Sequence, residues 1–217
     1  MLHYQYQRHD RPGEHRSFLI DAGAQVHGYA SDITRTYGNG DADCGARSAG
    51  VDRVQQQLCA KVRAGQNYPE LHLEAHRLLA GVLAEQEIVR MSPEAMVAEA
   101  VTSTFFPHGL GHPIGLQVHD VAGFHANEQG DTIPRPAGHP FLRMTRTLEE
   151  NFVVTIEPGL YFIPMLLAQL KAGPHAAHVN WSKIDHLTKF GGIRIEDEVR
   201  ATTGAPENLT RDAFAVA

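Results

Sequence analysis

The sequence predicts an α+β fold, in which strands and helices occupy separate stretches of the chain. Three observations support this prediction. Two strand-like stretches, SFLIDAGA and YASDITRTY, lie near the start with Gly28 between them. Helical periodicity then runs from about residue 51 to residue 106, and two apolar strand-like stretches follow near the end. Alternating βαβ units would need strands between the helices, and the pattern shows none there.

The first two stretches predict a β-hairpin that brings two aspartates together. A turn near Val26 and His27 would place Asp21 directly opposite Asp32. Opposed residues of a hairpin point to the same face, with Cβ atoms about 5 Å apart. Two carboxylates this close repel each other, so one would stay protonated unless a cation lies between them.

Three helices are expected after the hairpin. Valine and leucine residues recur at helical spacing over residues 51–62, and Gly65 is a residue type that commonly closes a helix. Pro69 suits the first turn of a second helix, which runs through the leucines up to residue 83. Ser92 is the predicted cap of a third helix, SPEAMVAEAVTSTFF.

The C-terminal part is expected to contain strands, NFVVTIEPGLYF and GGIRIEDEVRAT, beside a loop-rich region with prolines at 134, 136, 140 and 174. Glu157 ends the first apolar strand, just before a Pro-Gly turn. In the second strand, alternation places Ile193 and Ile195 on one face and Arg194 and Glu196 on the other.

The acids and one loop together favour a metal site. A single strand-borne acid usually faces solvent, but four acids stand at such places, and four gathered carboxylates are costly without cations. The loop FFPHGLGHPIGLQVHD carries His108 and His112 at the spacing of a zinc-binding helix, yet glycine follows His108 and the neighbouring prolines and glycines break a helix. We therefore expect a glycine-rich loop whose backbone approaches a bound group closely. One imidazole with four carboxylates suits two Mn²⁺ ions, with Co²⁺ or Zn²⁺ as alternatives.

Composition narrows the class of protein. The 217-residue chain has a formal net charge of −6 and no basic stripe, which argues against a nucleic-acid partner. No apolar run approaches the roughly 18 residues that span a bilayer, so no membrane partner is expected. The first residues do not have the pattern of a signal peptide. Two cysteines, Cys44 and Cys59, fit a reducing, cytoplasmic location.

Four segments together resemble a known family. DAGAQVHGYASDITRT, FFPHGLGHPIGLQVHD, VVTIEPGLYF and GGIRIEDEV are similar, in order and spacing, to the pita-bread metallopeptidases. They look most like bacterial Xaa-Pro dipeptidases (prolidases) and the related organophosphorus acid anhydrolases. The resemblance implies the pita-bread fold and covers nearly the whole chain.

The resemblance also implies a set of metal ligands. Asp21 would bind one metal ion, and Asp32 would bridge both. His112 would be the sole imidazole ligand. Glu157 would bind the same ion as His112 and act as general base or proton shuttle. Glu196 would be the second bridging carboxylate.

Further roles follow from the same resemblance. His119 would contact the scissile carbonyl or its oxyanion, and His108 would be a second histidine of the catalytic set that binds no metal. Arg194 would lie beside the metals and could meet a substrate carboxylate with both of its terminal nitrogens. His3 matches a histidine on the substrate side, and Tyr68 is expected to line the leaving-group pocket.

The implied activity is the dinuclear metal-dependent hydrolysis of Xaa-Pro dipeptides, with a side activity on organophosphates. Two alternatives remain open: a non-catalytic module or inactive fragment that binds a peptide or partner, and an aminopeptidase P. Full-length relatives are expected to be homodimers. They are much longer, so residues 1–217 are expected to be a catalytic domain that lacks its first strand and helix and the family's N-terminal domain. On that expectation, the chain alone would be a poor dipeptidase and would expose apolar surface.

Overall fold

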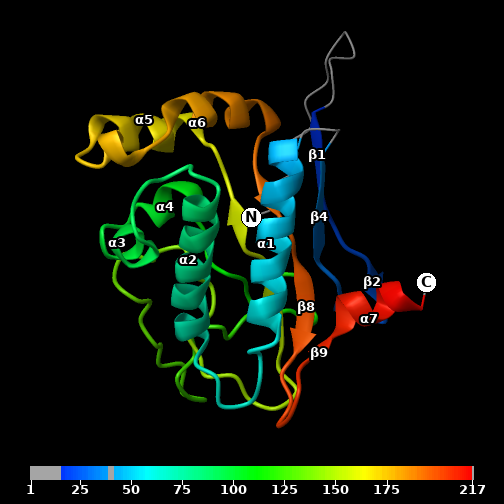
Figure 1. Cartoon of the computed structure of the whole chain (residues 1–217). Coiled ribbons are helices and arrows are strands. Elements are labelled where there is room, and N and C mark those ends of the chain that lie inside the picture. The colour runs from blue at the N-terminus through cyan, green and yellow to red at the C-terminus, as the bar shows by residue number, and fades with distance from the viewer. Residues whose placement is uncertain (1–15, 39–41, 217) are drawn as a thin grey trace.

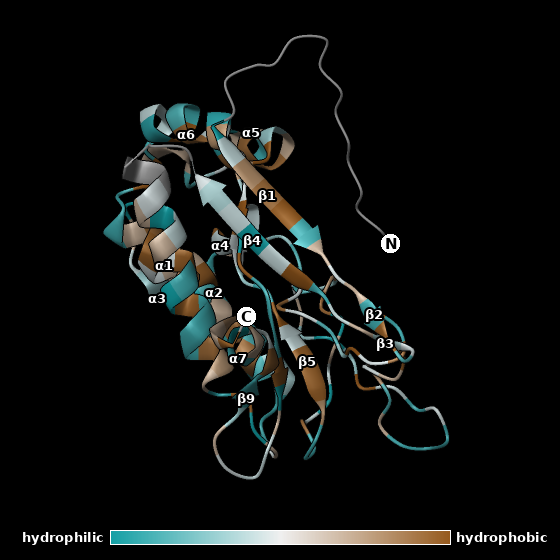
Figure 2. Ribbon diagram, turned by 90° about the vertical axis from the view of Figure 1, so that its right-hand side faces the viewer, coloured by the Kyte–Doolittle hydropathy of each residue, from teal (hydrophilic) through white to brown (hydrophobic). Residues whose placement is uncertain are grey.

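The computed structural model describes residues 16–38 and 42–216, and for residues 42–44 it describes the backbone alone. Two long helices, α1 (Ala42–Cys59) and α2 (Tyr68–Glu85), lie side by side. They cover one face of a set of short sheets, as Figures 1 and 2 show from two directions. The mixture of helices and strands confirms the predicted α+β class.

The N-terminal hairpin forms, but its register differs from the prediction. Strand β1 (Ser17–Ala22) pairs with β4 (Ile33–Gly38), and β2 (Gln25–Val26) pairs with β3 (Tyr29–Ala30) at the tip. The turn residues are His27 and Gly28, with φ angles of 52° and 90°. A tight hairpin turn of this kind needs two residues in the left-handed region, and Gly28 supplies one of them without strain. The turn therefore lies one residue later than expected.

The shifted turn changes the partner of the first aspartate. Asp21 pairs with Thr34, two residues beyond Asp32, so the prediction that the two aspartates stand directly opposite each other was wrong. A one-residue shift of the turn moves every partner by two positions and therefore preserves the face on which each side chain lies. Asp21 and Asp32 remain diagonal neighbours on one face of the hairpin.

The second and third predicted helices begin where the sequence predicts, whereas α1 begins at Ala42, well before Val51, and ends at Cys59, before Gly65. The side chain of Asn67 accepts a hydrogen bond from the Glu70 amide at the start of α2, whose first turn holds Pro69. Ser92 caps the next helix in the same way. The predicted third helix is nevertheless two helices, α3 (Pro93–Ala98) and α4 (Thr102–Phe105), because Ala100 adopts a positive φ of 53° between them.

The C-terminal strands form two small sheets. Strand β5 (Val153–Ile156) pairs with β8 (Asp197–Arg200), which also pairs with β9 (Glu207–Asn208). Strand β6 (Gly159–Leu160) pairs with β7 (Ile193–Arg194). Single bridges join Thr34 to Glu196 and Pro113 to Val154, so the hairpin and the histidine loop both attach to these sheets. Ile193 and Ile195 are buried, as the predicted alternation requires.

The stretch between β6 and β7 contains more helix than the sequence predicts. It holds α5 (Pro164–Ala172) and α6 (Trp181–Leu187), together with single turns of 3₁₀ helix at Ala176–His178 and Thr188–Phe190. Residues 126–150 do form loops, but the prediction of a loop-rich region was wrong for 164–190. Asn180 caps α6, and α5 and α6 each bury only two side chains, a pattern too short to be recognised from periodicity. A last helix, α7 (Leu209–Ala215), packs against β8.

The core fills the space between the long helices and the strands. Leu58, Leu79, Leu83, Val154 and Ile156 are among its buried members. Phe18 and Tyr37 stay about 58–59% exposed on the hairpin, where β1 is largely apolar (Figure 2). Among the helices that the structure describes, none combines the length and apolar character needed to cross a bilayer.

Candidate metal centre

The five predicted ligands come from four separate parts of the fold. Asp21 lies on β1 and Asp32 precedes β4, whereas His112 lies in the loop after α4. Glu157 directly follows β5, and Glu196 lies between β7 and β8. Ligand atoms of Asp21, Asp32 and Glu196 lie within 4.8 Å of one another, and so do those of His112, Glu157 and Glu196. Glu196 belongs to both groups, so all five form one cluster.

His112 is oriented as a metal ligand would be. Its Nε2 lies 3.6 Å from Oδ2 of Asp32 and 3.8 Å from Oε1 of Glu157. Its Nδ1 lies 3.0 Å from the carbonyl oxygen of Pro113, so this nitrogen carries the proton and donates it there. Nε2 then presents its lone pair to the carboxylates. A hydrogen bond at the far nitrogen is the usual way in which proteins fix a histidine ligand.

The glycines of the histidine loop allow close backbone packing. A Cβ on Gly111 would lie 2.0 Å from the carbonyl oxygen of Thr155, and one on Gly109 would lie 2.9 Å from Cα of Leu142. These close approaches are to neighbouring backbone, whereas the sequence predicts that the loop glycines approach a bound group. The His112 amide donates to Oγ1 of Thr155 at 3.1 Å, which fixes the loop against β5.

Tyr68 lies beneath this loop. Its side chain is fully buried, and its hydroxyl donates to the Thr155 carbonyl at 2.8 Å. This position supports the His112 loop and gives no support to the expected place of Tyr68 in an open leaving-group pocket.

One guanidinium lies among the acids. Arg194 donates to the carboxylate of Asp21, and its Nε lies 3.2 Å from Oγ1 of Thr34. The same Nε lies 3.8 Å from Glu157 and 3.9 Å from Glu196. The Thr34 hydroxyl also donates to Glu196 at 2.5 Å. Arg194 thus contributes a single positive charge to a cluster of four carboxyl groups.

The electrostatics of the cluster call for additional positive charge. Burial, reinforced by Glu196, raises the pKa of Glu157 well above its ordinary value. Burial also raises the pKa of Glu196 to about 8, with a further contribution from the charge of Asp32. Carboxyl groups behave in this way when they are crowded without enough cations. Two divalent ions would supply that charge, and the hard oxygen donors with one imidazole fit them.

The raised pKa values predict how the metal-free chain responds to pH. A carboxyl group whose folded pKa exceeds its unfolded value stabilises the fold below the unfolded pKa, and this stabilisation is lost as pH rises toward the folded pKa. For Glu196 that window runs from 4.5 to about 8, and Glu157 acts in the same direction. Buried histidines with a lowered pKa have the opposite effect, because they make the fold more stable as pH rises. Their effect is confined to pH values below their unfolded pKa of about 6.5.

We therefore expect the free energy of unfolding of the metal-free chain to fall by on the order of 2 kcal/mol between pH 6.5 and pH 8. Urea unfolding in the presence of a chelator measures this change. Glu196→Gln should flatten the slope, and saturating Mn²⁺ should remove it. A metal-free stability that stays constant or rises over this interval would contradict the assignment.

Two further histidines, His119 and His108, lie near the five clustered side chains but are not among the predicted ligands. The ring of His119 meets that of His112 edge to face, with centroids 4.3 Å apart, and a ligand atom of His119 lies close to Asp32 and His112. Burial lowers the pKa of His119 to about 4, so its imidazole is neutral at pH 7. Nε2 of His108 lies 2.9 Å from the hydroxyl of Tyr161. His3 lies outside the described residues.

Tyr161 is a site residue that the sequence analysis missed. Its hydroxyl contacts His108 and accepts a hydrogen bond from Arg194 at 3.2 Å. A Cβ on Gly192 would lie 2.3 Å from its ring, so that glycine makes room for the tyrosine. Strand alternation could not have found it, because Tyr161 lies just after β6 and the Pro-Gly pair at 158 and 159 separates it from Glu157 at the end of β5.

Comparisons with known proteins agree with this geometry. The sequence model of metallopeptidase family M24 matches residues 1–203. The chain is 55% identical over 218 residues to a Xaa-Pro dipeptidase of Stenotrophomonas maltophilia (strain K279a), covering 100% of this chain and 49% of that protein. It is 56% identical over 219 residues to one from Xanthomonas campestris pv. campestris (strain B100), covering 99% and 49%. The chain thus spans about half the length of the curated relatives it matches.

Solved structures show the same fold. Proline aminopeptidase P II from Yersinia pestis superposes with a TM-score of 0.67 at 30% identity, covering 90% of this chain and 38% of that one. The aminopeptidase PepP of Pseudomonas aeruginosa superposes with a TM-score of 0.66 at 26% identity over the same shares. These likenesses confirm the predicted pita-bread fold.

Proposed function

Because the chain belongs to metallopeptidase family M24, we propose that it carries the catalytic centre of a metal-dependent Xaa-Pro dipeptidase. The observation that supports this most is the convergence of one imidazole and four carboxylates, from distant parts of the sequence, around His112 and Glu196. We assign residues 1–217 to the catalytic domain.

The proposed ligands are those that the sequence predicts. Asp21, Asp32, His112, Glu157 and Glu196 would hold two divalent ions. Mn²⁺ is the ion that we propose first, with Co²⁺ and Zn²⁺ as the alternatives, because four of the five donors are carboxylates. When bound, the two ions supply Lewis acidity toward the peptide carbonyl and a nucleophile at neutral pH.

The protein's own side chains would position the substrate and move protons. Glu157 would accept a proton from the attacking water and pass it to the prolyl nitrogen, whose bond to the carbonyl carbon breaks. His119, neutral at pH 7, would donate a hydrogen bond to the oxygen on which negative charge develops. Arg194 and His108, linked through the Tyr161 hydroxyl, would form a polar wall against which the substrate carboxylate binds.

The dipeptidase proposal is favoured over both alternatives. Identity is 55% to proteins named Xaa-Pro dipeptidase and 26–30% to the aminopeptidase P structures. A module without catalysis would have no use for five clustered ligands, and all five are present here. We also propose the organophosphate side activity and a cytoplasmic location, and a homodimer for the full-length relatives.

Hydrolysis of dipeptides tests the proposal. The assay compares Gly-Pro, Gly-Ala and Gly-Pro-Ala with Mn²⁺, Co²⁺ or Zn²⁺ supplied, for the 217-residue chain and for a chimaera with the N-terminal half of the Stenotrophomonas relative. We expect the chimaera to cleave Gly-Pro and to stop when a chelator removes the metal. Preference for the tripeptide would indicate an aminopeptidase P instead. A folded chimaera without any peptidase activity, beside an active relative, would overturn the proposal.

A further inference from the structure

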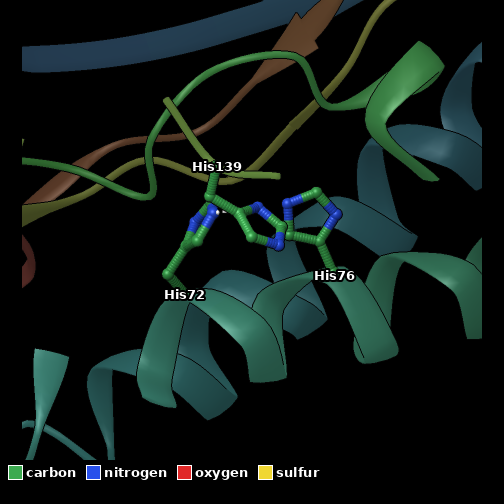
Figure 3. Close-up of side chains that lie close together, drawn as sticks. All are labelled: His72, His76 and His139. Carbon is green, nitrogen blue, oxygen red and sulfur yellow. Dashed lines mark hydrogen bonds between the residues drawn. The ribbon is translucent and has the colours of Figure 1, made fainter. Parts of the chain in front are cut away.

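A second cluster of histidines lies apart from the proposed ligands. His72 and His76 are four residues apart on α2 and therefore share one face of the helix. His139 reaches them from the loop that precedes β5, and Figure 3 shows the three side chains gathered against one another. The ring centroid of His139 lies 4.6 Å from that of His72 and 4.8 Å from that of His76. The i,i+4 histidine pair on a helix is the spacing of many zinc sites.

The two helix-borne histidines are buried without full hydrogen bonding. His72 and His76 are each 1% exposed. Nδ1 of His76 is 2.8 Å from the Thr102 hydroxyl, but its Nε2 has no partner. Nδ1 of His72 is unpaired as well, although Nε2 of that ring is the nitrogen that faces His139. Buried polar atoms are normally paired, and a native structure that leaves one unpaired often indicates an ion or water that belongs there.

We propose that His72, His76 and His139 bind one divalent transition-metal ion of the Zn²⁺ class, separately from the dinuclear centre. Nε2 of His76 is its free nitrogen, and the Thr102 contact at the other nitrogen would fix the ring as outer-shell partners commonly do. Nε2 of His72 and Nδ1 of His139 lie 2.9 Å apart, and one proton at most can lie between them. A metal ion bound there would accept the lone pairs of both nitrogens.

The donor set distinguishes this site from the first one. Three neutral imidazoles suit Zn²⁺, Cu²⁺ or Ni²⁺, whereas the carboxylate-rich cluster suits harder ions such as Mn²⁺. Burial, reinforced by the neighbouring histidines, lowers the pKa of His72 to about 2 and that of His76 to about 3. Both imidazoles are therefore neutral over the physiological pH range, and protons would not compete with the metal there.

The surroundings of the three histidines leave room for a fourth ligand and indicate a structural role for the ion. The histidines line a cavity of about 200 Å³ that is also bordered by Ser103, Phe106 and Leu142. A zinc ion with three protein ligands normally completes its tetrahedron with water. The ion would tie α2 to the loop that carries His139, and Phe141 and Leu142 of that loop pack against Gly109. It would thus brace the segment from which His112 is presented.

Zn²⁺ binding by the full chain tests the site once the first centre has been disabled. In a His112→Ala, Glu196→Gln background, equilibrium dialysis followed by elemental analysis should find one tightly held Zn²⁺ per chain. Adding His139→Asn should weaken that binding at least tenfold, and so should adding His72→Gln. The matched control replaces His175 and His178, a histidine pair elsewhere on the surface with centroids 6.4 Å apart, by alanine and should leave binding unchanged.

His139 is only partly buried, so its variant should keep the fold, which circular dichroism checks. This variant decides the question even if His72→Gln fails to fold. In the same background, Co²⁺ should give the visible absorption of a tetrahedral nitrogen site, and His139→Asn should abolish it. Absence of bound Zn²⁺, or binding that His139→Asn leaves intact, would overturn the proposal and leave three histidines packed for structural reasons only.

Discussion

Replacing His112 by alanine is expected to remove at least one of the two metal ions and to abolish most dipeptidase turnover. Among the described residues, His112 is the one imidazole whose ring nitrogen lies within 4 Å of both Asp32 and Glu157. Loss of an outer-shell partner alone typically weakens metal binding 10–100-fold, so loss of the ligand should weaken it by at least about 100-fold. Elemental analysis of the purified variant measures the metal, and Gly-Pro hydrolysis by the chimaera measures the turnover.

The matched variant is His119→Ala, because its ring lies directly against that of His112. If His119 acts on the substrate oxygen, this variant should keep its metal and lose turnover by roughly 10²–10³-fold, as removal of one oxyanion donor does. Equal metal loss in the two variants would show that the roles of the histidines are wrongly assigned.

Glu157→Gln is expected to have an equally large effect by a different route. The amide keeps an oxygen for the metal but can no longer accept a proton, so kcat should fall by roughly 10²–10⁴-fold. Metal content should fall far less than in His112→Ala. The control is Glu99→Gln, which changes an exposed acid away from the cluster. If kcat decreases by less than about tenfold while the metal is retained, Glu157 does not carry the proton.

Much of the centre could be predicted from local pattern. Strand alternation placed Arg194 and Glu196 on one face, and the structure confirms it with an Nε to carboxylate distance of 3.9 Å. The prolines and glycines around His108 and His112 excluded a zinc helix, and both histidines do lie in a loop. These features depend on residues close together in the sequence, for which periodicity and backbone sterics are sufficient guides.

Features that depend on distant contacts could not be predicted in this way. The hairpin register followed from the conformations of His27 and Gly28, which the sequence allowed at more than one position. The break at Ala100 and the short helices α5 and α6 lack a strong periodic signal. The contact of His139 with His72 joins residues 67 positions apart, and no local pattern connects them.

The central claim is that five side chains hold two metal ions, and a crystal structure of the Mn²⁺-loaded protein with anomalous diffraction data tests it most directly. We predict two anomalous peaks about 3.5–4 Å apart, as in other dinuclear hydrolytic centres. Asp21, Asp32, His112, Glu157 and Glu196 should be their protein ligands. A single peak, or an ordered structure in which any one of these five side chains points away from the ions, would contradict the account.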